Sequence, residues 1–173
     1  MATGTDDFGK ALITETKRRL IHEFPPRIHK SLGQLTEEEI WERPNAETVS
    51  VGNLVLHLIG NVRQNILSAL GGAPDQRRRQ IEFDEKGPIP TAELLRRLDE
   101  LIAETDQALD RVDPSTLLTV RPVQGYQESG LSILVHVIEH FSYHVGQISY
   151  IAKSRKAVDL GYYAGIDLNV TTP

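Results

Sequence analysis

Residues 131–152 of the chain read LSILVHVIEHFSYHVGQISYIA. Glu139 is the one formally charged residue in these 22 positions, so the stretch is long and apolar enough to suggest a membrane span. Several imidazole side chains and Gln147 lie along it, however, and such polar groups are costly in hydrocarbon unless another span shelters them. The sequence contains no second hydrophobic span. We therefore expect a buried helix within a helical bundle, and no membrane contact.

Three other segments have apolar residues at every third or fourth position, which is typical of a helix with one buried face. These segments cover about 6–24, 50–70 and 91–112. Proline has no backbone N–H to donate, so Pro25-Pro26 is expected to end the first of them. Gly71-Gly72 is expected to end the second.

Short additional helices are predicted in the connections between the long ones. Thr36 and Glu39 have the spacing of a capping box, which begins a helix of one or two turns. Residues 113–129 are irregular, and within them 117–120 are a candidate for a short extended segment. The fold class predicted from these patterns is all-α: a four-helix bundle that forms a single domain over residues 1–173.

Composition and charge exclude several classes of protein. The chain has 24 acidic residues against 19 lysines and arginines, and this acidic balance argues against broad attraction to nucleic acid or anionic membranes. Cysteine is absent, which excludes disulfide scaffolds, thiolate metal sites and cysteine nucleophiles. Asp6 and Asp7 interrupt the apolar run that an export signal needs, so a cytoplasmic location is expected.

The histidines of residues 131–152 have a spacing that suits a metal ion. His136, His140 and His144 follow one another at intervals of four, and the last two share a largely apolar helical face. Two imidazoles at this spacing can both reach one ion. The alternative is a pair of core histidines that are hydrogen-bonded to backbone or hydroxyl groups.

A polar stripe on the second long helix bears on this choice. Asn53, His57, Asn61 and either Gln64 or Ser68 follow one another at helical spacing beside the apolar face. Unpaired polar groups are costly to bury, so an interior stripe needs a partner, and the His140–His144 pair on a facing helix would supply one. Simple exposure of the stripe to solvent is the alternative.

Peptidase motifs are present only in part. Residues 136–140 fit the pattern H-x-x-E-H, but Asp159 and Asp167 are the only carboxylates that follow. In the forward pattern H-E-x-x-H, Phe141 stands where the general base is needed. A peptidase is therefore not expected.

Two motifs together resemble the DinB-like superfamily, and more narrowly its poorly characterised branch with HLxGN and HxxxHxGQI signatures. They are NLVLHLIGN at 53–61 and HFSYHVGQI at 140–148, and the likeness extends over about residues 32–156. The resemblance implies a four-helix bundle in which three histidines bind a divalent metal ion. At the matching positions stand His57, His140 and His144, whereas His136 lies outside this set and is expected to pack beside it.

The resemblance also implies a class of chemistry. Better-characterised relatives are similar to transferases that use low-molecular-weight thiols, so a metal-dependent transferase acting on a small thiol substrate is one expectation. A non-catalytic metal- or ligand-binding bundle linked to stress, or a metal-free interaction module, is the alternative. Imidazole ligands favour zinc or nickel, and a homodimer is expected. Asn61 and Gln147 are candidates to orient the ligand rings.

The basic run Arg77-Arg78-Arg79 has two interpretations. It is either a solvated turn or a site for an anionic substrate. Glu82 is close enough in sequence to form an ion pair with Arg78 or Arg79.

Overall fold

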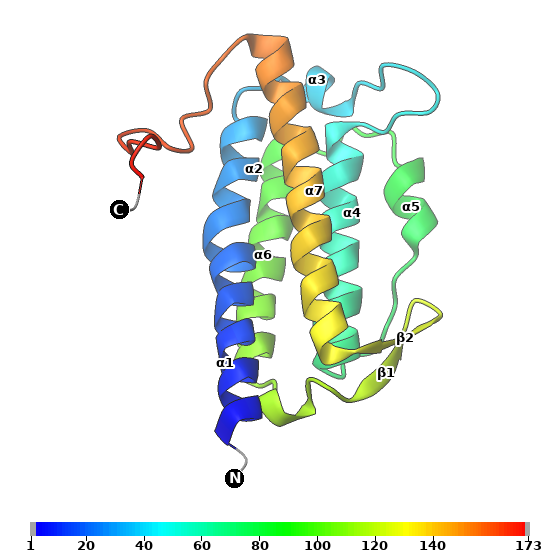
Figure 1. The fold of residues 1–173 in the computed structure, drawn as a ribbon. Coiled ribbons are helices and arrows are strands. Elements are labelled where there is room, and N and C mark those ends of the chain that lie inside the picture. Colours follow the sequence, from blue (N-terminus) through cyan, green and yellow to red (C-terminus); the bar gives the residue numbers. More distant parts are fainter. Residues whose placement is uncertain (1–2, 172–173) are drawn as a thin grey trace.

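The computed structural model describes residues 3–171, which are mostly helical. Long helical segments lie side by side along most of the molecule's length (Figure 1). They are α1 (Thr3–Lys17) continued by η1 (Arg18–Glu23) and α2 (Phe24–Leu32); α4 (Val51–Val62) continued by η2 (Arg63–Leu70); α6 (Thr91–Asp110); and α7 (Gly130–Lys156). The shorter elements are α3 (Glu37–Trp41), α5 (Arg79–Asp84), η3 (Pro114–Thr116), β1 (Val120–Val123) and β2 (Tyr126–Ser129).

The apolar stripes of these long segments meet in one hydrophobic core. Leu98 and Leu101 of α6, for example, are fully buried, and so is Phe141 of α7. The Phe141 ring stacks on Phe24 of α2 with 5.7 Å between the ring centroids. The apolar residues that recur at every third or fourth position of the sequence are therefore the residues that pack in the core.

The expected end of the first helix at Pro25-Pro26 is wrong. Residues 18–23 form a π-helical turn, and both prolines then lie in the first turn of α2. The N–H groups of a first turn have no partner within their own helix, so proline loses no hydrogen bond there. The chain thus continues as one long helical segment to Leu32.

The capping box predicted at the start of α3 is confirmed. The backbone N–H of Glu39 donates to Thr36 Oγ1 at 3.2 Å, and the N–H of Thr36 donates to Glu39 Oε2 at 2.7 Å. A second capping box, formed by Ser50 and Asn53, begins α4. Both helices therefore begin where local side-chain chemistry satisfies their free N–H groups.

A small β-hairpin modifies the expectation of a purely helical fold. β1 and β2 pair antiparallel, with Val120 opposite Ser129 and Val123 opposite Tyr126. Gln124 and Gly125 form the two-residue turn with φ of 51° and 83°, the positive values that a tight hairpin turn requires. Extended structure thus begins at Val120 rather than filling residues 117–120.

The short helix α5 lies beside α4 and away from the long helices α1, α2 and α6 (Figure 1). Asn53 Nδ2 donates to the carbonyl oxygens of Glu82 and Glu85 at 2.9 and 2.8 Å. Arg43 donates to the Glu85 carbonyl as well, at 3.0 Å. These bonds fix the end of α5 against the first turn of α4, so α5 covers the polar stripe of α4.

None of the helices in residues 3–171 combines the length and the continuous hydrophobicity that crossing a membrane requires.

Tyr162 attaches the C-terminal segment to the helices. Its hydroxyl lies 2.9 Å from Ser31 Oγ of α2 and 2.7 Å from Ser149 Oγ of α7, and donates to the Arg27 carbonyl at 3.2 Å. The Arg27 guanidinium lies over the Tyr162 ring, 5.1 Å from its centroid. Tyr162 is therefore part of the packing between α2 and α7.

Replacing Tyr162 by Phe should lower the free energy of unfolding by about 1 kcal/mol, because the hydroxyl contacts to two buried serines are lost. Thermal or urea unfolding measures the change. Tyr150→Phe is the matched control, since Tyr150 is 74% exposed and its hydroxyl has no hydrogen-bond partner among the described residues. Equal stability of the two variants would contradict the assigned role of Tyr162.

Candidate metal centre

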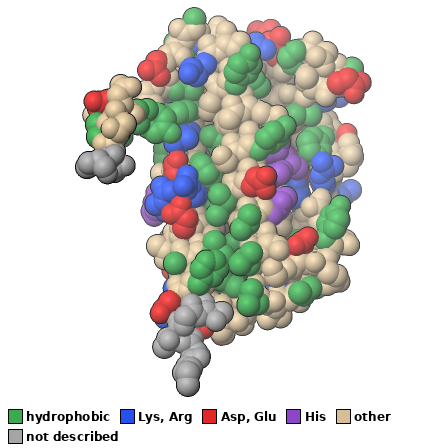
Figure 2. All heavy atoms as spheres, in the orientation of Figure 1, with side chains coloured by type: hydrophobic (Ala, Val, Ile, Leu, Met, Phe, Trp, Pro, Cys, Tyr) green, Lys and Arg blue, Asp and Glu red, His purple; other side chains and the backbone are tan. Residues whose placement is uncertain are grey.

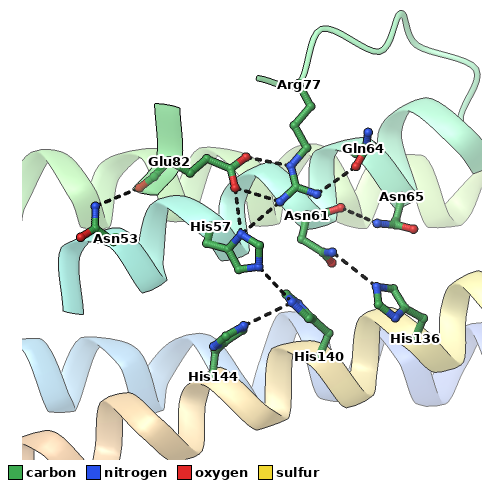
Figure 3. Close-up of polar contacts among 10 residues, drawn as sticks. All are labelled: Asn53, His57, Asn61, Gln64, Asn65, Arg77, Glu82, His136, His140 and His144. Carbon is green, nitrogen blue, oxygen red and sulfur yellow. Dashed lines mark hydrogen bonds and ion pairs between the residues drawn. The ribbon is translucent and has the colours of Figure 1, made fainter. Parts of the chain in front are cut away.

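The polar stripe of α4 and η2 is buried. Asn53, His57, Asn61 and Gln64 are each less than a tenth exposed. α5 and the preceding segment 71–78 cover one side of the stripe, and α7 faces its other side (Figure 3). Solvent exposure of the stripe, the alternative left open by the sequence, is therefore wrong.

The stripe brings His57 against the histidine pair of α7. His140 Nε2 lies 3.1 Å from His57 Nε2 and 3.2 Å from His144 Nε2. One ligand nitrogen from each ring can be chosen so that all lie within 4.8 Å of one another. Tetrahedral zinc places the nitrogens of two imidazole ligands about 3.3 Å apart, so the spacing suits a metal ion.

Partners on the far side of two rings determine where their protons lie. His57 Nδ1 is 2.8 Å from Glu82 Oε2, and His144 Nδ1 is 2.7 Å from Gln147 Oε1 (Figure 3). Carboxylate and carbonyl oxygens only accept, so we assign the proton to Nδ1 in both rings. In His57 this assignment follows the shorter of two contacts, since Arg77 Nη2, which can only donate, also lies 3.2 Å from Nδ1. The Nε2 atoms of His57 and His144 therefore present lone pairs toward His140.

When the three rings are neutral, hydrogen bonds among them cannot pair all three of the facing Nε2 atoms. His140 Nε2 carries one proton at most, so it can donate to only one of the two lone pairs that face it. Its own Nδ1 is buried and has no hydrogen-bond partner among the described residues. A cation between the three Nε2 atoms would accept a lone pair from each of them, so the three histidines fit a metal ion.

Burial keeps the facing rings neutral. It lowers the pKa of His140 to about 3, and the neighbouring His144 and His57 act in the same direction. Burial also lowers the pKa of His144, although the hydrogen bond to Gln147 opposes this shift. Neutral imidazole is the form that binds metal ions, so the lower pKa prepares both rings as ligands.

A buried ion pair holds the Glu82 carboxylate in place. Arg77 Nε donates to Glu82 Oε1 at 2.7 Å and Arg77 Nη2 donates to Oε2 at 2.8 Å, with the arginine side chain only 4% exposed. Burial raises the pKa of Glu82, but the hydrogen bonds from Arg77 and His57 outweigh it and leave the pKa below its usual range. Glu82 is thus an ionised acceptor for the His57 ring.

The pairing expected for Glu82 from the sequence is wrong. Glu82 contacts Arg77 rather than Arg78 or Arg79, because the side chain of Arg77 turns inward to Gln64 and Glu82. The guanidinium of Arg79 instead lies over the Phe83 ring, 4.6 Å from its centroid. Of the basic run, one residue therefore belongs to the site.

Gly60 leaves the space that the Glu82 carboxylate occupies. A Cβ at position 60 would collide with Glu82 Oε1. Gly60 lies on α4 between His57 and Asn61, so the carboxylate can approach the helix backbone at this position. Gly146 of α7 is different, because a Cβ there would meet no atom within 4 Å.

His136 lies beside the candidate ligands rather than among them. Its ring centroid is 5.4 Å from that of His140, and its Nε2 is 3.4 Å from Asn61 Nδ2. Of the two residues expected to orient the ligand rings, Gln147 contacts His144 as predicted, whereas Asn61 contacts His136. His29 is remote from the group and pairs with Asp99.

These observations define a mostly helical protein in which one histidine of α4 and two of α7 form a candidate metal site. The family model described as a protein of unknown function, DUF1572, matches residues 7–162, and the chain belongs to this DinB-like family. The matched range includes both histidine motifs. No curated protein and no solved structure matches the chain.

Gly60→Ala should destabilise the protein, although Gly→Ala within a helix ordinarily stabilises by about 1 kcal/mol. The new Cβ displaces Glu82 and leaves the buried Arg77 without its carboxylate, which should cost about 3 kcal/mol. Thermal unfolding of the metal-free protein measures the difference. Gly146→Ala is the control and should raise the stability by about 0.5–1 kcal/mol. Stabilisation by both substitutions would contradict the position of Glu82.

Proposed function

We propose that the chain is a DinB-like four-helix bundle of the HLxGN and HxxxHxGQI branch, and that His57, His140 and His144 bind one divalent cation. The observation that carries the proposal is the convergence of three Nε2 atoms, two of them within 3.2 Å of the third. Zinc and nickel are the proposed ions, since both suit imidazole ligands.

The chain's own residues prepare this site before a cation enters. α7 supplies two rings from one rigid helix, and α4 supplies the third from the facing helix. Glu82 and Gln147 hold the protons of two rings on Nδ1, away from the centre. Supports of this kind typically contribute 10- to 100-fold to metal affinity.

His57→Ala should lower both the metal content and the melting temperature of the metal-loaded protein, because the unfolded chain cannot hold the three distant ligands together. Protein purified without a histidine tag is incubated with zinc or nickel, dialysed and analysed for metal. We expect about one equivalent in the unmodified chain. His22→Ala, which changes an exposed histidine, should alter neither quantity. Full occupancy in His57→Ala would exclude the assigned site.

We further propose that the protein transfers or adds a low-molecular-weight thiol to an electrophile. A divalent ion held by three neutral histidines keeps its charge and open positions, and so lowers the pKa of a thiol bound there. Two features of this chain support access of a thiol to a cation held by the three histidines. The candidate group contains no carboxylate, and histidine side chains reach the surface between α7 and α5 (Figure 2).

The alternative is a non-catalytic metal- or ligand-binding bundle. Turnover of the metal-loaded protein with a panel of thiols and electrophiles separates the two functions, with His140→Ala as the inactive reference. Metal binding without turnover of any pair would favour the alternative. The homodimer predicted from the sequence stays a prediction, which sedimentation velocity tests.

A further inference from the structure

A cavity lies near the candidate metal centre at the start of α7. It has a volume of about 420 Å³, lies between the β1–β2 hairpin and α7, and is lined in part by His136 and Asn65. This volume is in the range of small-molecule sites, which span roughly 300–1,000 Å³. The hairpin therefore does more than connect α6 to α7, because it forms one wall of a space large enough for a ligand.

His136 lies between the cavity and a candidate ligand ring. His136 lines the cavity, and the His136 and His140 rings pack with 5.4 Å between their centroids (Figure 3). Two other cavities among the described residues approach the candidate metal centre from the Nδ1 sides of its rings. One is lined by Glu82 and another by Gln147, the residues that occupy the Nδ1 sides of His57 and His144. None of these cavities is lined by a candidate ligand itself, and on the His136 side the residue between the cavity and His140 packs on the ligand ring without a hydrogen bond to it.

The charge of the lining indicates which ligands the cavity suits. The half-buried carboxylate of Glu128 faces it, together with the polar side chains of Gln124 and Tyr126. No lysine or arginine lines it. Arg121, which lies opposite Glu128 in the hairpin, donates to the carbonyl oxygens of Thr116 and Ala69, and Arg77 is paired with Glu82.

We propose that this cavity binds the part of the substrate that does not react, and that it selects a neutral or cationic, hydrogen-bonding group over an anionic one. The inference rests on the proposed metal site, and Glu128 is the residue that sets the preference. An ammonium group near Glu128 gains a favourable charge interaction, whereas a carboxylate there is repelled and finds no lysine or arginine in the cavity lining. The amide and phenol groups of the lining serve neutral and cationic ligands alike.

The test uses three thiols of equal chain length with different ends: aminohexanethiol, mercaptohexanol and mercaptohexanoate. Each is titrated into the cobalt-loaded protein, and the thiolate-to-cobalt charge-transfer band reports binding. We expect the amine to bind at least as tightly as the alcohol and about tenfold more tightly than the carboxylate, a ratio that corresponds to roughly 1.4 kcal/mol.

Two isosteric variants locate the effect. Glu128→Gln should reduce the preference for the amine over the carboxylate severalfold. Glu139→Gln removes the same charge from an exposed position of α7 outside the cavity lining and should leave the preference unchanged. Cobalt that fails to bind at all would refute the proposed metal site. Cobalt binding with equal affinity for the three thiols, or an equal response of both variants, would overturn the inference about the cavity alone.

Discussion

The buried ion pair between Arg77 and Glu82 is the interaction on which the polar half of the structure depends. The Arg77 and Glu82 side chains are only 4% and 11% exposed, and a buried charge without its partner costs several kcal/mol. The pair is stable because its geometry is bidentate and because both side chains make further hydrogen bonds. Arg77 also donates to Gln64, and Glu82 also accepts from His57. One guanidinium thereby connects the segment before α5, the carboxylate of α5 and the π-helical end of α4.

α7 serves the core and the candidate site from different faces of one helix. Phe141 and Ile148 are fully buried in the core, whereas His140 and His144 lie on the adjoining face toward α4. Because the core residues fix the rotation of α7, they also fix the direction of its imidazoles. Precision at the site thus derives from apolar packing, which leaves the helix little freedom to rotate.

Local patterns predict most of the helices and the three histidines. The i,i+4 pair of α7 and the polar stripe of α4 are properties of single helices, so the sequence alone can place them. The hairpin was missed because its strands have four residues each and Val123 is the one residue of β1 that is buried, which leaves no alternation to read. The helix end predicted at Pro25-Pro26 was wrong for another reason. A π-helical turn precedes the two prolines and places them in the first turn of α2, where the helix needs no N–H donor from them.

Glu82 shows where sequence reasoning ends. It is 25 residues from His57, and α5 has no buried residue whose periodicity would tell which face turns inward. Its position also has a chemical consequence. The carboxylate acts on the Nδ1 side of His57, and Arg77 neutralises it there, so it contributes orientation without adding negative charge among the three Nε2 atoms. A carboxylate placed directly among those atoms would offset the charge of a bound cation and fill one of its open positions. The space left by Gly60 keeps Glu82 on the outer side of the ring, and a ligand set of three neutral imidazoles is the result.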